Sequence, residues 1–324
     1  MTGAAPHLGA ILLVAGGMVC LALGAGWLVD GASRLALRLG IAPMLVGLTV
    51  VGFGTSMPEF SVSVLAAARG SRGLSLGNAV GSNIMNLLLV MGVAALIRPI
   101  AVHGDGDGAP GRTLERDLLL GLLPAGIIMA AAWRGGLSRP WAAALVLVFG
   151  AFVWLSVRSA RRTRGERVAV RGSVAGNAAL TVVGIVLLVG GAELMVRGGV
   201  TLARAAGISE AVIGLTLVAF GTSLPELATS VAAAIKSEPE ISVGNVLGSN
   251  VFNLGLVVGT AFLIRPGAVP VFVIRQDVPF LVGATVLVGG FVLRDGRISR
   301  TEGGGMLLAF VGYMVFLAMR GLGG

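Results

Sequence analysis

Two glutamates in long apolar stretches are the residues of this sequence most suited to chemistry. Glu59 and Glu226 each follow the pattern Gly-Thr-Ser-X-Pro, at Gly54–Pro58 and Gly221–Pro225. An ionised side chain at the centre of a bilayer costs at least about 2.5–3.5 kcal/mol, so it needs a compensating partner. The alternative is that each glutamate is protonated or hydrogen-bonded within a helix bundle. A repeated pair in one context favours a shared cation instead.

Hydroxyl and amide side chains form a second repeated motif. The segment LGNAVGSNIMN begins at Leu76, and VGNVLGSNVFN begins at Val243. Residues four positions apart lie on the same face of a helix. We therefore expect four ligands from this motif, namely Ser82, Asn86, Ser249 and Asn253.

The other asparagines of this motif have a different predicted role. Asn83 and Asn250 point about 100° away from the ligand face, so we interpret them as polar contacts between helices. Asn78 and Asn245 lie a further turn along the ligand stripe. A purely adhesive role fits these two less well than it fits Asn83 and Asn250.

Proline interrupts both glutamate-bearing helices near the middle of their apolar runs. Pro58 and Pro225 lack a backbone donor and clash with the carbonyl four residues earlier, so each helix must open. Broken helix at membrane depth is tolerated where it is buried in protein or lines a wet cavity. The carbonyls near each break are candidate ligands, at Gly52, Thr55, Ala219 and Thr222.

All of these candidate ligands are hard oxygen atoms, which suit Ca²⁺ and Na⁺. The two carboxylates carry a charge of −2 when ionised, which neutralises one Ca²⁺. The same oxygens can be regrouped into smaller Na⁺ sites, and competition for one ligand set is a physical basis for exchange. A thiolate metal site is excluded, because Cys20 is the sole cysteine, and an imidazole zinc or iron site is not expected, because His7 and His103 are the sole histidines.

The elements that position these residues must lie in a membrane. Hydrophobic residues make up 56% of the 324 and charged residues 12%, a balance that excludes a soluble domain. The apolar runs suit helices crossing roughly 30 Å of hydrocarbon, with little of the alternation of a β-barrel. We expect an all-α membrane protein with ten transmembrane helices, of which the second and seventh are broken. The spans fall near residues 9–29, 41–68, 74–97, 114–133, 140–157, 174–196, 208–235, 242–264, 277–293 and 304–320.

The chain repeats itself at an offset of 167 residues. GIAPMLVGLTVVGFGTSMPEF begins at Gly40 and GISEAVIGLTLVAFGTSLPEL begins at Gly207. Because each half has an odd number of spans, the second copy must enter the membrane from the opposite side, which predicts an inverted-topology repeat. We expect a first five-helix repeat at 1–157, a basic linker at 158–172 and a second, inverted repeat at 173–324.

Arginine in the linker sets the predicted orientation. The linker holds six arginines and one glutamate, so we place it in the cytoplasm. The loops on that side then carry 15 of the 24 basic residues and the other side 9, which puts both termini outside. We expect a multi-pass protein of the cell inner (plasma) membrane whose first span is retained. The net charge of +9 is spread between spans, so a nucleic-acid partner is not expected.

The two repeated motifs resemble the alpha repeats of the calcium/cation antiporter superfamily, G-[TS]-S-x-P-E and G-N-x-x-G-S-N. The similarity is greatest to prokaryotic sodium/calcium exchangers and covers essentially the whole chain. The resemblance implies that Ca²⁺ is held by Thr55, Glu59, Thr222 and Glu226. It implies Na⁺ sites at Ser56, Ser82, Ser223 and Ser249 with the carbonyls of Gly52 and Ala219. It also implies that Asn86 and Asn253 fill the centre.

The resemblance implies an antiporter in which several Na⁺ enter for each Ca²⁺ extruded, while the first and sixth spans slide across the core. Asparagine at Asn253, where some relatives carry aspartate, argues against potassium dependence. Proton-coupled relatives carry an acidic residue soon after their G-N motif, where this chain has Gly81-Ser82 and Gly248-Ser249. This difference disfavours Ca²⁺/H⁺ antiport, which is the alternative. Transported Ca²⁺ and Na⁺ and the lipid bilayer are the expected partners, without a cofactor, and a monomer is the working expectation.

Two other classes of function fit the sequence less well. A passive channel would usually need symmetric subunits around a pore, whereas this chain carries its repeat within itself. An intramembrane enzyme would need a base near one of the serines, and no His or Lys lies at a suitable spacing. We therefore expect a transporter, not an enzyme.

Overall fold

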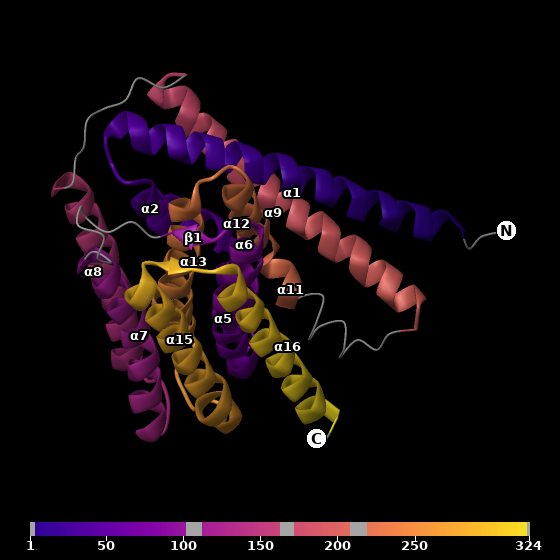
Figure 1. The fold of residues 1–324 in the computed structure, drawn as a ribbon. Helices are drawn as coiled ribbons and strands as arrows, with labels where there is room; N and C mark the ends of the chain where they lie inside the picture. Colours follow the sequence, from indigo (N-terminus) through magenta and orange to yellow (C-terminus); the bar gives the residue numbers. More distant parts are fainter. Residues whose placement is uncertain (1–3, 102–111, 163–171, 208–218, 323–324) are drawn as a thin grey trace.

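The computed structural model describes residues 4–101, 112–162, 172–207 and 219–322, which are almost entirely helical. The elements up to residue 162 are α1 (Ala4–Leu39), α2 (Pro43–Val46), the π-helical η1 (Gly47–Val51), α3 (Gly52–Thr55), α4 (Met57–Ala68), α5 (Arg72–Met85), the π-helical η2 (Asn86–Val90), α6 (Met91–Ile97), β1 (Ile100–Ala101), α7 (Arg112–Trp133) and α8 (Arg139–Arg162). Figure 1 shows their arrangement.

The later part of the chain contains the corresponding set of elements. They are α9 (Val174–Ala205), α11 (Ala219–Thr222), α12 (Leu224–Ile235), α13 (Pro239–Val251), the π-helical η4 (Phe252–Val257), α14 (Val258–Ile264), the π-helical η5 (Val273–Asp277), α15 (Val278–Asp295), β2 (Arg297–Ile298) and α16 (Arg300–Leu322). Both bounds of α12 lie 167 residues after those of α4, and both bounds of α14 lie 167 residues after those of α6. The sequence offset is therefore also an offset of secondary structure.

The described residues contain seven helices that are long and apolar enough to cross a membrane, which makes this an all-α membrane protein. They are His7–Leu39, Arg72–Ile97, Arg139–Arg158, Val174–Ala205, Pro239–Ile264, Val273–Asp295 and Arg300–Met319. An eighth candidate is the broken pair Pro43–Thr55 and Met57–Ala68, bent by 47°. The predicted span 208–235 lies partly outside the described residues.

Several helices extend beyond their predicted apolar spans. The helix α1 continues ten residues past the predicted end at 29 and stops at Gly40, whose φ of +68° terminates it. At the other end of the chain, α16 begins at Arg300 through a capping box: Ser299 Oγ accepts from the Glu302 N–H, and Glu302 accepts from the Ser299 N–H. Hydropathy marks the membrane-embedded part, whereas these caps mark the helix ends.

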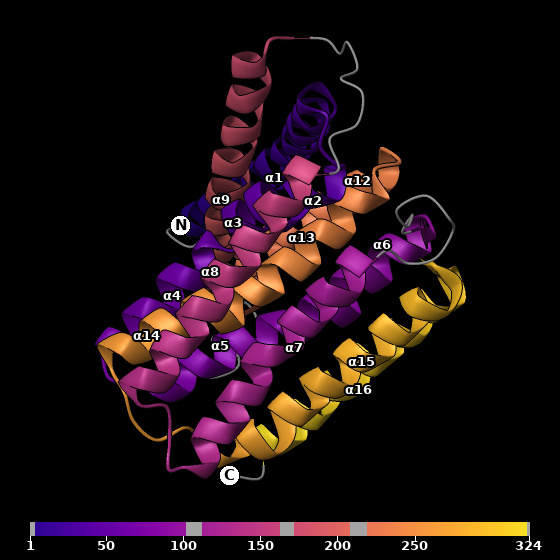
Figure 2. The same cartoon turned by 90° about the vertical axis from the view of Figure 1, so that its left-hand side faces the viewer.

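The two longest helices, α1 and α9, lie side by side and antiparallel against the rest of the bundle (Figures 1 and 2). Their backbones meet at glycines that recur every seven residues. A Cβ added at Gly17 would lie 2.6 Å from the Gly191 carbonyl oxygen, and a Cβ added at Gly24 would lie 2.8 Å from the Gly184 carbonyl oxygen. Small residues allow this approach, which is how helices associate in membranes. The seam has its own buried cluster, which includes Leu28 and Leu188.

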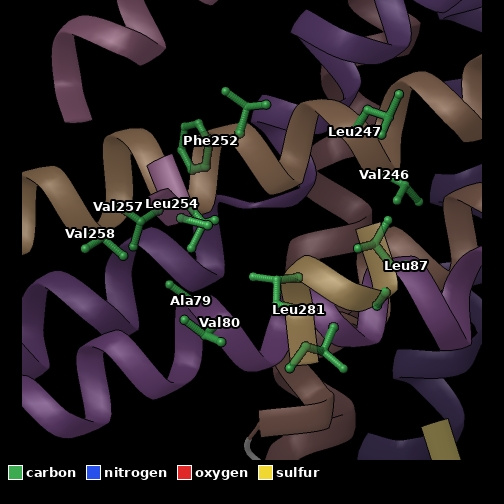
Figure 3. Close-up of a cluster of buried hydrophobic side chains, with 14 of the residues drawn as sticks. Ala79, Val80, Leu87, Val246, Leu247, Phe252, Leu254, Val257, Val258 and Leu281 are labelled. Carbon is green, nitrogen blue, oxygen red and sulfur yellow. The ribbon is translucent and has the colours of Figure 1, made fainter. Parts of the chain in front are cut away.

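The centre of the molecule is formed by two helical stretches, α5–α6 and α13–α14. Within their membrane windows, 72% and 78% of the residues are buried, against 28% for α1 and for α9. Figure 3 shows side chains from both stretches and from α15 packing together. The labelled members are Ala79, Val80, Leu87, Val246, Leu247, Phe252, Leu254, Val257, Val258 and Leu281.

Contacts join several of the helix connections that the structure describes, and they fall into two groups. In one group, Lys236 Nζ lies 2.6 Å from Asp30 Oδ1, and Ser33 Oγ donates to Glu238 Oε1 at 2.6 Å. In the other group, Leu137 pairs with Gly267 through backbone hydrogen bonds of 3.0 Å. These groups match the sets of loops that the sequence analysis assigns to the two sides of the membrane.

The glycine seam can be tested at neighbouring positions of α9. A Cβ on Gly191 would lie 2.8 Å from the Gly17 carbonyl oxygen, whereas a Cβ on Gly190 meets nothing within 4 Å. We expect Gly191→Ala to lower the free energy of unfolding by about 1–3 kcal/mol through overpacking. Gly190→Ala should raise it by up to about 1 kcal/mol, because alanine has the higher helix propensity. Thermal unfolding of the two purified variants in detergent measures the difference, and equal melting temperatures would contradict the seam.

Candidate cation-binding site

Each glutamate sits just after a single-residue break in its helix. Ser56 separates α3 from α4 and Ser223 separates α11 from α12, with ψ values of 8° and 6° in place of the helical value. Proline occupies the first turn of α4 and of α12, where a backbone N–H has no partner within the helix, so the missing N–H of proline costs no helical hydrogen bond. Glu59 and Glu226 therefore lie in a first helical turn, where the helix dipole favours a negative charge.

The serines at the breaks bind the glutamates of the opposite half. Ser56 Oγ donates to Glu226 Oε1 at 2.8 Å, and Ser223 Oγ donates to Glu59 Oε1 at 3.0 Å. None of these four side chains is more than 1% exposed. The two halves are thus joined at their most polar point by reciprocal bonds.

The threonines before the breaks complete this arrangement. Thr222 ends α11 and its side chain interacts with Glu59, while Thr55 ends α3 and its side chain interacts with Glu226. Thr55 Oγ1 also lies 3.0 Å from Asn245 Oδ1. Each carboxylate therefore meets a serine and a threonine from the other half.

Four buried oxygen atoms of the predicted ligands have no hydrogen-bond partner. They are Glu59 Oε2, Glu226 Oε2, Asn86 Oδ1 and Asn253 Oδ1. A buried acceptor without a donor is costly, and such atoms are rare in folded proteins. Bound cations would satisfy oxygens of this kind. No cluster of three or more His, Cys, Asp or Glu side chains occurs in the described ranges, so the oxygens of amides and hydroxyls must supply the remaining ligands.

The carbonyl of Gly52 faces the site because the broken helix lies directly against α13. Ser249 Oγ donates to Gly52 O at 3.2 Å and lies 3.5 Å from Glu226 Oε1. A Cβ on Gly52 would lie 2.9 Å from the Ser249 backbone nitrogen, and a Cβ on Gly248 would lie 2.2 Å from the Leu48 carbonyl oxygen. Only glycine at both positions permits this contact.

The other two predicted ligands, Ser82 and Ala219, are described by their positions in the helices. Ser82 is buried on α5 and is 3% exposed. Ala219 is the first residue of α11 and adjoins the segment 208–218, which lies outside the described residues. The structure thus links Glu59, Glu226, Ser56, Ser223, Ser249, Gly52, Thr55 and Thr222 through direct contacts.

Ser63 and Ser230 lie one turn beyond the two glutamates and bind asparagines that contact the glutamate backbone. The sequence analysis does not predict these serines as part of the site. Asn78 Nδ2 donates to Ser63 Oγ at 2.9 Å and lies 3.4 Å from the Glu59 carbonyl oxygen. Asn245 Nδ2 makes the same pair of contacts with Ser230 Oγ, at 3.2 Å, and with the Glu226 carbonyl oxygen, at 3.4 Å. The signal was present in the sequence, because each serine follows a glutamate by four residues at the repeat offset.

Asn83 and Asn250 join helices, as predicted, but they also contact the predicted ligands. Asn83 Oδ1 accepts from Asn253 Nδ2 at 3.1 Å, and Asn250 Oδ1 accepts from Asn86 Nδ2 at 3.2 Å. The interpretation of these two asparagines as simple contacts between helices is therefore incomplete. Helix periodicity gives the direction of a side chain from its own axis, but not which partner lies there.

Comparison with known proteins identifies the same two-part pattern. The model of the family described as Sodium/calcium exchanger protein matches residues 9–158 and again residues 176–319. The chain is similar to Inner membrane protein YrbG of Escherichia coli, with 36% identity over 96% of this chain and 95% of that protein. It is also similar to Sodium/calcium exchanger MaX1 of Methanosarcina acetivorans, with 30% identity over 93% of this chain and 96% of that protein.

A solved structure has the same fold over nearly the full length. The structure of the sodium-calcium exchanger NCX_Mj soaked with Na⁺ and Sr²⁺ matches with a TM-score of 0.83 and 30% sequence identity. The match covers 95% of this chain and 98% of that chain.

The two glutamates can be tested separately as cation ligands. We expect Glu59→Gln and Glu226→Gln each to weaken Ca²⁺ binding by about 3 kcal/mol, roughly a hundredfold, because a buried cation loses a charged partner. Calorimetric titration of the purified variants measures the affinity. Glu193→Gln is the control, since Glu193 is exposed and pairs with Arg197 at 2.6 Å. An unchanged affinity in both site variants would rule out this site.

Proposed function

Because the chain belongs to the sodium/calcium exchanger protein family, we propose that it exchanges Na⁺ for Ca²⁺ at one central site within a membrane. Members of this family are transporters, so the chain is a cation/Ca²⁺ antiporter and not an enzyme. Its ions are substrates, and no cofactor is involved. The observation that carries the proposal is the reciprocal bonding of Glu59 and Glu226, each with one oxygen still unpaired.

We assign each ion to its own set of predicted ligands. Ca²⁺ is held by Glu59, Glu226, Thr55 and Thr222. Na⁺ is held in flanking sites by Ser56, Ser82, Ser223 and Ser249 with the carbonyls of Gly52 and Ala219, and Asn86 and Asn253 contribute at the centre. Since Glu226 is hydrogen-bonded to both Ser56 and Ser249, proposed ligands of Ca²⁺ and of Na⁺ are in direct contact, which supports competition between the two ions.

Sodium coupling is favoured over proton coupling by the neutral ligands. The oxygens around the two carboxylates come from hydroxyls, amides and carbonyls, which bind Na⁺ but neither gain nor lose protons near neutral pH. The structural match to an exchanger soaked with Na⁺ and Sr²⁺ also supports Na⁺. Ca²⁺/H⁺ antiport remains the alternative, in which Glu59 and Glu226 would themselves carry the protons.

We propose ten transmembrane spans in two inverted repeats, residues 1–157 and 173–324, joined by the linker 158–172. Three observations support inversion. The equivalent helices α1 and α9 are antiparallel, the Ser–Glu contacts are reciprocal, and the family model matches twice, with the starts of the two matches 167 residues apart. Reciprocal contacts arise from a two-fold axis, and an axis that makes spanning helices antiparallel must lie in the membrane plane.

We further propose an inner-membrane location with the linker in the cytoplasm and both termini outside. The excess of arginine in the linker and its neighbouring loops supports this orientation. The E. coli relative is named an inner membrane protein, which supports the location. One chain supplies both glutamates and both serines, so a monomer suffices for the site.

Ion coupling can be measured in proteoliposomes. We expect vesicles loaded with Na⁺ to take up ⁴⁵Ca²⁺ when diluted into medium without Na⁺, because the outward Na⁺ gradient drives the exchange. Vesicles with only a proton gradient should show background uptake. Glu59→Gln serves as the inactive control and Glu193→Gln as the active one. Uptake that follows the proton gradient alone would establish the alternative.

The orientation can be measured by cysteine labelling, since Cys20 is the sole cysteine and can be replaced by alanine. In that background we expect Ser71→Cys to react with a membrane-impermeant maleimide in intact cells, because its loop is placed outside. Arg164→Cys, in the linker, should react only after the membrane is permeabilised. The reverse pattern would show that the termini lie in the cytoplasm.

A further inference from the structure

Four asparagines form a closed polar unit between α5–η2 and α13–η4. They are Asn83, Asn86, Asn250 and Asn253, and none is more than 8% exposed. Asn86 and Asn253 are proposed ligands, whereas Asn83 and Asn250 are not among the proposed ligands. The direction of each hydrogen bond within this unit shows what the second pair does.

The orientation of one amide is fixed by a backbone carbonyl. A primary amide has a donating and an accepting end of nearly the same shape, so packing alone does not orient it. Asn83 Nδ2 lies 2.9 Å from the Asn250 carbonyl oxygen, which can only accept, so the nitrogen must face that carbonyl. Asn83 Oδ1 then accepts from Asn253 Nδ2 at 3.1 Å. The oxygen of Asn253 is left on the opposite side, buried and without a partner.

The same arrangement is repeated in the other direction. Asn250 Nδ2 donates to the Asn83 carbonyl oxygen at 3.4 Å, and Asn250 Oδ1 accepts from Asn86 Nδ2 at 3.2 Å. The oxygen of Asn86 is likewise buried and unpaired. Since the two arrangements are related by the repeat, each of Asn83 and Asn250 orients one ligand of the opposite half.

We propose that Asn83 and Asn250 are positioning residues that hold the carbonyl oxygens of Asn253 and Asn86 toward the bound ions. The inference rests on the proposed function and deepens it at the same site. Reversing either ligand amide would turn its NH₂ group, which carries partial positive charge, toward the cation. Second-shell partners of this kind commonly set metal affinity by holding the ligand atom in place.

The surroundings of Asn83 and Asn250 offer no competing partner among the residues that line the cavity behind them. The described lining is apolar apart from the two asparagines and Thr285. Thr285 Oγ1 donates to the carbonyl of Leu281 in its own helix at 2.8 Å. The amides are therefore oriented by one another and by backbone carbonyls. Thr285 also provides a polar group in the same cavity that lies outside the asparagine unit.

The proposal predicts a loss of affinity rather than of turnover. We expect Asn83→Leu to raise the Ca²⁺ concentration for half-maximal exchange about tenfold, because Asn253 loses its acceptor and its amide becomes free to rotate. The maximal rate should stay within about twofold, since no atom that contacts the ion is removed. Thr285→Val is the matched control and should change neither value. If Asn83→Leu behaves like Thr285→Val, the proposal is overturned.

A double-mutant cycle separates positioning from general damage. In Asn253→Asp the side chain has two equivalent oxygens, so there is no amide left to orient. Asn83→Leu should then change the half-maximal Ca²⁺ concentration by less than about twofold in the Asn253→Asp background, against about tenfold in the parent. An equal effect in both backgrounds would show a purely structural role and overturn the inference.

Two further measurements distinguish loss of positioning from loss of transport and from misfolding. Calorimetric Ca²⁺ titration of the same four proteins tests the positioning even where no transport is detected, so failure of the exchange assay alone counts against the proposed function. If Asn83→Leu does not fold, the repeat-related cycle of Asn250→Leu with Asn86→Asp gives the same test. Equal Ca²⁺ affinities across the cycle would overturn the inference whatever the transport assay shows.

Discussion

The structure depends on two carboxylates buried at the contact between its halves. Burying a charge without a partner is costly, so everything around Glu59 and Glu226 serves to compensate them. The helix breaks place both groups at helix starts, and the serines at those breaks cross to the opposite carboxylate. One oxygen of each carboxylate remains buried without a hydrogen-bond partner, and the proposed function assigns these oxygens to the transported ions. Fold and site are therefore specified by the same few residues.

Much of the site is predictable because its residues occur twice. The offset of 167 residues connects Glu59 with Glu226 from the sequence alone, and the proline after each Thr-Ser pair locates the breaks. In the structure, two of the predicted ligand serines, Ser56 and Ser223, are hydrogen-bonded to the predicted glutamates. That each serine contacts the glutamate of the other half could not be predicted, because spacing along one helix contains no information about the facing helix.

The length of α1 and the role of Asn83 and Asn250 could not be predicted from the sequence, for two different physical reasons. The full length of α1 was missed because its last turns carry charged residues, although Asp30 pairs with Lys236 at a helix connection. The role of Asn83 and Asn250 was missed because the hydrogen-bonding direction of an amide depends on its neighbours and not on its position in a helix. Both omissions concern contacts between segments far apart in sequence.

The reciprocal serine–glutamate bonds have an evolutionary consequence. Each half holds a glutamate whose serine partner belongs to the other half, so neither half alone contains a complete pair. A five-helix ancestor of one half, encoded before gene duplication, would have needed a second copy inserted in the opposite orientation to form the same bonds. Under the proposed inverted topology, such an ancestor would have been a dual-topology homodimer, and fusion of its two copies would have allowed the halves to diverge while keeping the crossed pairs.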